Sequence, residues 1–295
     1  MARSTREATI GRGTATTFVA PALGLIGVFL IVPALWTLYL SLTNLTLTGS
    51  NSLNPDVVGL ENFRKTVSDA AFWNSVRISV LFVGGSLIGQ VAIGFGLAWI
   101  FRGWKGVGRR VLEVLAVVAW IIPGSVVAFL WIAFLDGSTG TLNWLLPGAL
   151  GNDVEWLLDY PVLSIIVFNT WRGAAFSMLL FGAALSAVPP SHLENARVFG
   201  ASTWQQLRDI VLPAIRGHIL TAVLLITLWT FNLFTPYLLT RGGPGSKTEI
   251  IPIFIYREAL RAGQLGFGAA ISAVMLTINL VIALAYLRVI RERRA

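Results

Sequence analysis

Six long apolar stretches constrain the fold of this 295-residue chain more than any other feature. A helix needs about 20 largely apolar residues to cross about 30 Å of hydrocarbon, because it rises about 1.5 Å per residue. Transmembrane β-strands would read as shorter segments of alternating polarity. The sequence therefore predicts an all-α integral membrane protein with six transmembrane helices. The six stretches are residues 18–42, 78–101, 114–135, 161–188, 219–240 and 268–287.

The composition agrees with a membrane protein and excludes several kinds of chemistry. Charged residues make up 12% of the chain, whereas soluble domains contain about 25%. The chain has no cysteine and two histidines, which excludes thiolate metal sites and leaves little room for other metal chemistry. Residues 245–248 lack the glycine that directly precedes lysine in a phosphate-binding loop. We therefore predict no cofactor or metal bound by this chain, and no ATPase activity of its own.

The basic residues predict how the helices are oriented. With a cytoplasmic N-terminus, 14 of the 22 Lys and Arg residues lie inside, seven lie outside, and Arg172 lies within the fourth span. Because cytoplasmic loops carry an excess of Lys and Arg, we predict that both termini are cytoplasmic. The net charge of +8 then reflects topology and does not indicate a nucleic-acid partner. The first span is too long for a signal peptide and should be retained.

This topology divides the chain into a membrane domain and two short ends. We predict a cytoplasmic N-terminal segment at residues 1–17, a six-helix membrane domain at 18–288 and a basic cytoplasmic tail at 289–295. Gly and Ala are frequent within the spans, which predicts close contacts between helices. Pro123 with Gly124 is expected to break the third span and help form a gate, and Pro236 is expected to break the fifth.

The inside loop between the fourth and fifth spans carries signals for two short helices. Ser191 with Glu194 matches an S-x-x-E capping box, and Gly200 is placed to end that helix in a left-handed conformation. Ser202 with Gln205 matches a second capping box. The second helix is expected to stop near Pro213, since proline interrupts helical hydrogen bonding.

Such a helix pair beneath the membrane has three interpretations. Glu194 could serve only as a local cap, the pair could read DNA, or it could form a docking surface for a soluble partner. DNA reading is disfavoured because Arg197 and Arg208 are offset by Glu194 and Asp209, and no basic stripe is present. The local cap and the docking surface both remain open on pattern alone.

This loop, residues 189–216, resembles the EAA loop of the permease subunits of binding-protein-dependent ABC importers. The chain departs from the family pattern at Asn195, which replaces a second alanine, and at Phe199, where an acidic residue often precedes the glycine. The resemblance implies that the loop docks in a cleft of an ATPase subunit, and that ATP and Mg²⁺ bind to that partner. The residues that it assigns to ATPase coupling are Glu194, Ala196, Gly200, Ala201, Ile210, Leu212 and Pro213.

The resemblance extends over nearly the whole chain. Residues 18–22, 36–42, 59–63 and 238–244 are similar to the first permease of carbohydrate importers of the maltose, trehalose and glycerol-phosphate type. It implies a type I ABC importer permease fold in the bacterial inner membrane. It also implies a heterodimer with a second permease, an ATPase dimer, an external solute-binding protein and a sugar or related polyol as the solute.

Polar and aromatic residues of the fourth and fifth spans are candidates for the substrate path. Sugar recognition favours aromatic faces with amides and charges near the membrane midplane. Arg172 lies about 16 Å into the membrane, where a charge normally faces the bundle interior or water. It could contact substrate or pair with a neighbouring subunit, and most of the 11 tryptophans are expected to be interfacial anchors or packing. The candidates are Asn169, Trp171, Arg172, Trp229, Phe231, Asn232 and Tyr237.

The main alternative function is an ion-coupled secondary transporter of a small polar solute. Such a transporter usually needs acidic residues within the membrane to couple ion flow, and often ten or more spans. None of the six predicted spans contains Asp or Glu. The ATP-driven importer is therefore the favoured interpretation.

Overall fold

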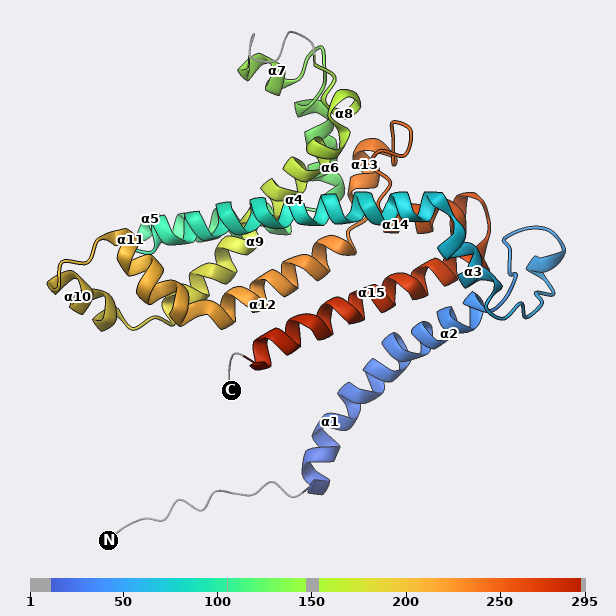
Figure 1. Ribbon diagram of the computed structural model, residues 1–295, viewed down its shortest axis with the longest axis horizontal. Helices are drawn as coiled ribbons and strands as arrows, with labels where there is room; N and C mark the ends of the chain where they lie inside the picture. Colours follow the sequence, from blue (N-terminus) through green and yellow to red (C-terminus); the bar gives the residue numbers. More distant parts are fainter. Residues whose placement is uncertain (1–11, 105, 147–153, 293–295) are drawn as a thin grey trace. The chain divides into compact units, whose positions relative to one another are not determined.

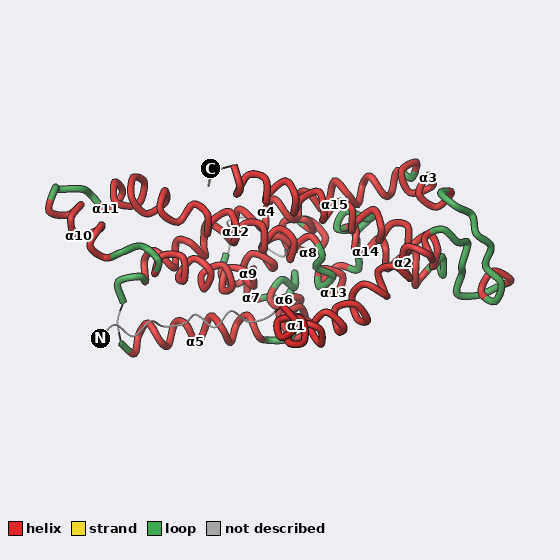
Figure 2. The backbone as a smooth tube through the Cα atoms, turned by 90° about the horizontal axis from the view of Figure 1, so that it is seen from below, coloured by secondary structure: helices red, strands yellow, loops and turns green. Residues whose placement is uncertain are grey.

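The computed structural model describes residues 12–104, 106–146 and 154–292. Regular structure in these residues is helical, apart from one isolated bridge between Thr43 and Val57 (Figure 2). The prediction of an all-α protein is confirmed. Lys105 and parts of both predicted terminal segments, residues 1–11 and 293–295, lie outside the described residues.

Within the described residues, five helices are long and apolar enough to cross a membrane. A sixth candidate consists of two helices that meet at an angle of 94°. The six predicted spans are therefore recovered when this bent pair counts as one. The five continuous helices are Thr16–Ser41, Ala70–Phe101, Pro161–Ser186, Thr203–Phe231 and Leu265–Val289.

The chain divides into two compact units, the first formed by Met1–Ser68 with Glu258–Val274. Asn62 binds the carbonyl groups at the end of the long apolar helix Thr16–Ser41. Its Nδ2 donates to the carbonyl oxygens of Ser41 and Thr43 at 3.0 and 2.7 Å. Lys65 Nζ donates to Gln264 Oε1 at 2.7 Å, which joins α3 to the residue before α15. The elements are α1 (Arg12–Ile26), η1 (Gly27–Ile31), α2 (Val32–Ser41), η2 (Ser50–Ser52), α3 (Glu61–Ser68), η4 (Arg257–Arg261) and the beginning of α15 (Leu265–Glu292).

The second unit, Asp69–Arg257 with Met275–Ala295, contains a bundle in which α4, α9 and α12 run side by side (Figure 1). Helices α10 and α11 lie at one end of this bundle. The elements are α4 (Ala70–Phe101), α5 (Val107–Ile121), α6 (Gly124–Phe134), α7 (Thr141–Leu145), α8 (Trp156–Asp159), α9 (Pro161–Ser186), α10 (Pro190–Val198), α11 (Thr203–Gln205), η3 (Gln206–Val211), α12 (Leu212–Phe231), α13 (Pro236–Thr240), α14 (Ile251–Tyr256) and the rest of α15.

Glycines allow α4 and α9 to pack closely. A methyl group added at Gly89 would lie 2.6 Å from Thr170 Cγ2, and one added at Gly94 would lie 2.8 Å from the backbone nitrogen of Met178. Both distances are shorter than a carbon atom tolerates. The predicted role of small residues in helix packing is confirmed at this interface.

The third predicted span is not one continuous helix. Helix α5 ends at Ile121 and α6 begins at Gly124, with Pro123 between them in an extended conformation at φ −52° and ψ 132°. Proline lacks an N–H group, and its ring clashes with the preceding helical turn. The predicted break at Pro123 is confirmed, while the single helix expected over 114–135 is corrected. The proposed role of the break in a gate stays a prediction.

The fifth predicted span, residues 219–240, differs from the observed helix at both ends, and the break expected near Pro236 is present. The helix already begins at Thr203 and ends at Phe231, and a separate short helix, α13, begins at Pro236. Asn232 follows the last turn, and its Nδ2 donates to the carbonyl oxygen of Leu228 at 2.7 Å. This side-chain bond satisfies a helix-end carbonyl, so the helix ends before Pro236 is reached.

Candidate functional site

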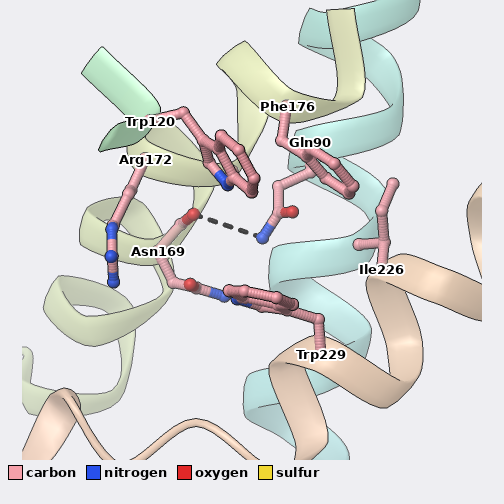
Figure 3. A pocket seen from close by; sticks show the side chains of 8 residues that line it. Gln90, Trp120, Asn169, Arg172, Phe176, Ile226 and Trp229 are labelled. Atoms are coloured by element: carbon pink, nitrogen blue, oxygen red, sulfur yellow. Dashed lines mark hydrogen bonds between the residues drawn. The ribbon is translucent and has the colours of Figure 1, made fainter. Parts of the chain in front are cut away.

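A recess in the second unit draws its lining from four helices (Figure 3). It lies beside the break between α5 and α6, because Trp120 precedes the break and Arg172 packs against the residue that follows it. The eight residues that we call the recess are Gln90 on α4, Trp120 on α5, Asn169, Arg172, Gly173 and Phe176 on α9, and Ile226 and Trp229 on α12.

Three aromatic rings form the walls of the recess. Trp120 stacks on Phe176 with ring centroids 5.1 Å apart and planes inclined by 16°. The ring of Trp229 lies 6.2 Å from Trp120 and 6.4 Å from Phe176. In this conformation the recess has room for about one water molecule, about 20 Å³. Its aromatic faces and few polar groups, and not its volume, resemble the lining of pockets for small organic ligands.

The side-chain amides of Gln90 and Asn169 lie between the aromatic walls of the recess. Gln90 Nε2 donates to the backbone oxygen of Asn169 at 3.2 Å, shown dashed in Figure 3. A side chain at Gly173 would collide with the Gln90 carboxamide, so the glycine makes room for this contact. The Asn169 side chain is 4% exposed, and its Nδ2 has no hydrogen-bond partner among the described residues. An unpaired buried donor of this kind is uncommon in proteins.

Arg172 places a positive charge at the edge of the recess. A methyl group added at Gly124 would lie 2.9 Å from Arg172 Nη1, so the guanidinium covers the first residue of α6. The ion pairs of the described residues involve Arg109, Arg208 and Arg257, and none includes Arg172. The charge is therefore not balanced by a carboxylate of the described part of this chain.

The structure brings together three of the seven predicted substrate-path residues, namely Asn169, Arg172 and Trp229. Trp171 is half exposed and packs against Trp131 instead, with ring centroids 5.9 Å apart. Phe231 is buried and does not line the recess.

The other two predicted residues lie elsewhere in the second unit. Asn232 exchanges hydrogen bonds with Asn279 of α15 at 3.0 and 3.2 Å. Tyr237 stacks on Phe234, with ring centroids 5.0 Å apart, and contacts Tyr256 at 4.9 Å. Neither residue lines the recess.

Sequence reasoning missed Gln90, Trp120 and Phe176. Gln90 is the one amide in the otherwise apolar second predicted span, and Trp120 immediately precedes the proline break. These two positions carried a signal, because a polar side chain within a span and a residue beside a helix break both tend to face the bundle interior. Phe176 carried none, since an aromatic residue in an apolar span reads as packing.

The 189–216 loop begins differently from its prediction. Helix α10 begins at Pro190 with Pro189 as its N-cap, and no side chain caps it. The predicted capping box of Ser191 with Glu194 is therefore wrong, because proline fits the first helical position and moves the helix start ahead of Ser191. Glu194 lies beyond the first turn and is exposed. The interpretation of Glu194 as only a local cap loses its basis.

The turn between the two helices agrees with its prediction. Gly200 has a φ of +79°, in the left-handed region that glycine adopts without strain. The N–H groups of Gly200 and Ala201 donate to the carbonyl oxygens of Arg197 and Ala196, both at 2.9 Å. This pair of bonds is the Schellman ending of a helix.

The second capping box is confirmed. The backbone N–H of Ser202 donates to Gln205 Oε1 at 2.7 Å, and the N–H of Gln205 donates to Ser202 Oγ at 3.3 Å. The expected stop near Pro213 is wrong, because the helix continues through Pro213 into α12. A π-helical stretch, η3, directly precedes this region. Its wider turns accommodate Pro213, which has no N–H to donate to the preceding turn of the helix.

The 189–216 loop is anchored on the bundle at its base and apolar at its tip. Leu193 and Leu207 pack on a buried cluster that includes Val211. Ile210 and Leu212 are half buried. At the tip, Val198 is 85% and Phe199 89% exposed. Burial of such side chains is favourable, so an exposed apolar tip on a firmly held base is typical of a surface that docks a partner.

Comparisons with known proteins identify relatives along most of the chain. Residues 90–295 match a family described as "Binding-protein-dependent transport system inner membrane component". A probable ABC transporter permease protein of Pyrococcus horikoshii is 32% identical over 278 residues, which cover 92% of this chain and 93% of that protein. The trehalose/maltose transport system permease protein MalF of Thermococcus litoralis is 30% identical over 294 residues, which cover 98% of this chain and 96% of that protein.

A solved structure shares the fold. One chain in the crystal structure of a bacterial alginate ABC transporter, in complex with an alginate pentasaccharide-bound periplasmic protein, matches with a TM-score of 0.77. The two chains are 22% identical, and the match covers 92% of each. The predicted permease-type fold is confirmed by this likeness.

Proposed function

The chain belongs to the family of inner membrane components of binding-protein-dependent transport systems, and we propose that it is one of two permeases that form the path for a sugar or related polyol. It is a multi-pass inner membrane protein and a transport subunit, not the ATPase. The observation that carries the proposal is the recess, where aromatic rings, amides and a guanidinium from four helices meet beside a helix break.

The recess supports a sugar as the solute. Trp120, Phe176 and Trp229 are rings of the kind that pack on the C–H surface of a pyranose, and Gln90 and Asn169 carry amides that suit its hydroxyl groups. The recess, with room for about 20 Å³, has to open before it can admit such a ring. A relative with 30% identity over nearly the full chain is named as a trehalose/maltose transport system permease. Broken transmembrane helices surround the sites of many transporters, which also fits the break at Pro123.

The 189–216 loop supports coupling to a separate ATPase. Its turn is held by the Schellman bonds at Gly200, and its base is anchored on the bundle through Leu193 and Leu207. A rigid helix pair transmits a rigid-body movement, whereas a flexible loop would absorb it. The exposed carboxylate of Glu194 is available to a basic group in the ATPase, and ATP and Mg²⁺ bind to that partner.

The remaining partners are inferred from the orientation of the chain and from its number of spans. The excess of basic residues on one side supports cytoplasmic termini and a cytoplasmic 189–216 loop. An external solute-binding protein would then deliver the sugar at the opposite end. Six spans supply half of a transport path, so we infer a heterodimer.

Reconstitution tests the proposal. The chain, its second permease, the ATPase dimer and the binding protein are placed in proteoliposomes, and sugar uptake is measured with ATP or with a proton gradient. We expect ATP to drive uptake and a protonophore to leave it unchanged. Uptake that follows the proton gradient without ATP would instead support the ion-coupled alternative.

A single substitution tests the role of the 189–216 loop in the same preparation. Glu194→Ala should uncouple transport, so that ATP hydrolysis continues while sugar uptake falls at least about tenfold. Asn195→Ala changes the neighbouring residue of the same helix and serves as the matched control. Equal uptake in the two variants would remove Glu194 from the coupling mechanism.

A further inference from the structure

Two positive features meet at the break in the third span. Helix α6 has no side-chain cap, and its first helical hydrogen bond runs from the N–H of Val127 to the carbonyl oxygen of Pro123. The preceding N–H groups, from Gly124 to Val126, have no helical partner. The uncapped N-terminus of a helix carries about half a positive elementary charge. The guanidinium of Arg172 lies against Gly124, at this same end.

No carboxylate of the described residues balances this arrangement. The predicted spans contain no Asp or Glu, and none of the ion pairs among the described residues includes Arg172. The carbonyl end of α5 lies at the same break and carries a partial negative charge, which offsets only part of the two positive features. A cation and a helix N-terminus repel each other in a medium of low polarity unless an anion lies between them.

An independent feature of the recess points to the same kind of ligand. Asn169 Nδ2 is a buried donor without a partner, one helical turn before Arg172 on the same helix. Figure 3 shows the Arg172 side chain at the edge of the recess and the Asn169 carboxamide beside Trp229. A guanidinium, a free amide N–H and an uncapped helix N-terminus are all donors. An acceptor with a negative charge suits each of the three.

We propose that the recess binds the anionic group of an acidic sugar, such as a uronate carboxylate, a sugar phosphate or a sulfonate. The inference rests on the proposed function and names the substrate class of the same site. Arg172 and Asn169 hold the anionic group at the N-terminus of α6, while the aromatic walls hold the ring. A transporter whose broken helix ends at its site uses the positive half-helix terminus for this purpose.

A screen of matched sugars tests the substrate class. The cognate binding protein is examined by thermal shift with glucose against glucuronate, galactose against galacturonate, and maltose against maltobionate. The best-bound probe and its matched partner are then measured for uptake in proteoliposomes that contain the complete transporter. We expect the acidic member of a pair to be preferred in both measurements.

Substitutions then assign the preference to the recess. Arg172→Gln should reduce uptake of the acidic probe about tenfold or more, while Arg172→Lys, which keeps the charge, should lose much less. Asn169→Asp brings a carboxylate to Arg172 and should abolish uptake of the acidic probe with the complex intact. Arg110→Gln, on the exposed start of α5, is the control and should transport as the wild type.

Two results would overturn the inference and are distinguishable from failure of the proposed function. ATP-driven uptake of a neutral sugar that is unaffected by Arg172→Gln would keep the proposed function and reject the anion site. Loss of the second permease from the purified complex in Arg172→Gln, with recovery in Arg172→Lys, would assign Arg172 to an ion pair between subunits. Failure of the proposed function would appear as absence of ATP-driven uptake for every probe.

Discussion

The recess and the 189–216 loop are built in opposite ways within the same unit. The recess collects side chains from α4, α5, α9 and α12, so its shape depends on how these helices pack. The turn and the second capping box of the 189–216 loop are held by bonds between near neighbours, as at Gly200 and Ser202. A change in helix packing should therefore damage the recess, and a change in local backbone bonding should damage the loop. The following substitutions test that separation.

The largest effect is expected where α4 packs on α9. Gly94→Leu places a side chain where a methyl group already lies 2.8 Å from the backbone of Met178, so the helices must separate. We expect little or no folded protein by fluorescence-detected size-exclusion chromatography. Gly96→Leu, two residues further on, meets open space and is the matched control. Similar yields of folded protein from the two variants would show that folding of the bundle does not require the close contact between α4 and α9.

The next largest effect concerns the aromatic wall of the recess. Trp120→Ala removes the ring that stacks on Phe176, and we expect sugar uptake to fall about tenfold while the complex still forms and hydrolyses ATP. Trp171→Ala, which changes a half-exposed ring that does not line the recess, should cost far less. If Trp171→Ala instead reduced uptake more than Trp120→Ala, the substrate path would lie on the other face of α9.

A smaller effect is expected at the turn of the 189–216 loop. Gly200→Val forces a branched residue to a φ of +79°, at a cost of roughly 1–2 kcal/mol or more. We expect the protein to insert and fold normally but to lose several-fold in uptake per ATP hydrolysed. Gly217→Val is the control, because that position is helical and also meets open space. Unchanged coupling in Gly200→Val would argue against a rigid turn.

The smallest effect is expected at the second capping box. Ser202→Ala removes the acceptor for the N–H of Gln205 and should destabilise the start of the helix by about 1 kcal/mol. Hydrogen exchange at residues 203–206 should become faster, while exchange in α4 and α9 stays the same. Ser202→Thr keeps the cap and should restore protection. A change that spreads into the bundle would contradict the separation between loop and recess.

Local signals in the sequence predicted the features that depend on near neighbours. The apolar stretches predicted the spans because a helix satisfies its own backbone in lipid wherever the residues are apolar. Pro123 predicted a break and Gly200 a left-handed turn, and both are present. The errors were also local, since Pro189 and Pro190 began α10 before the expected Ser191 cap, and η3 carried the helix through Pro213.

By itself, the sequence determined that the chain is an all-α membrane protein with a helix pair between its fourth and fifth spans, because hydropathy and turn chemistry are properties of consecutive residues. Only the tertiary structure decided which polar and aromatic side chains meet. It grouped Asn169, Arg172 and Trp229 with Gln90 and Trp120, and it separated them from Trp171 and Tyr237. The physical reason is that these neighbours depend on helix rotation and separation, which glycines such as Gly89 and Gly173 set through close packing.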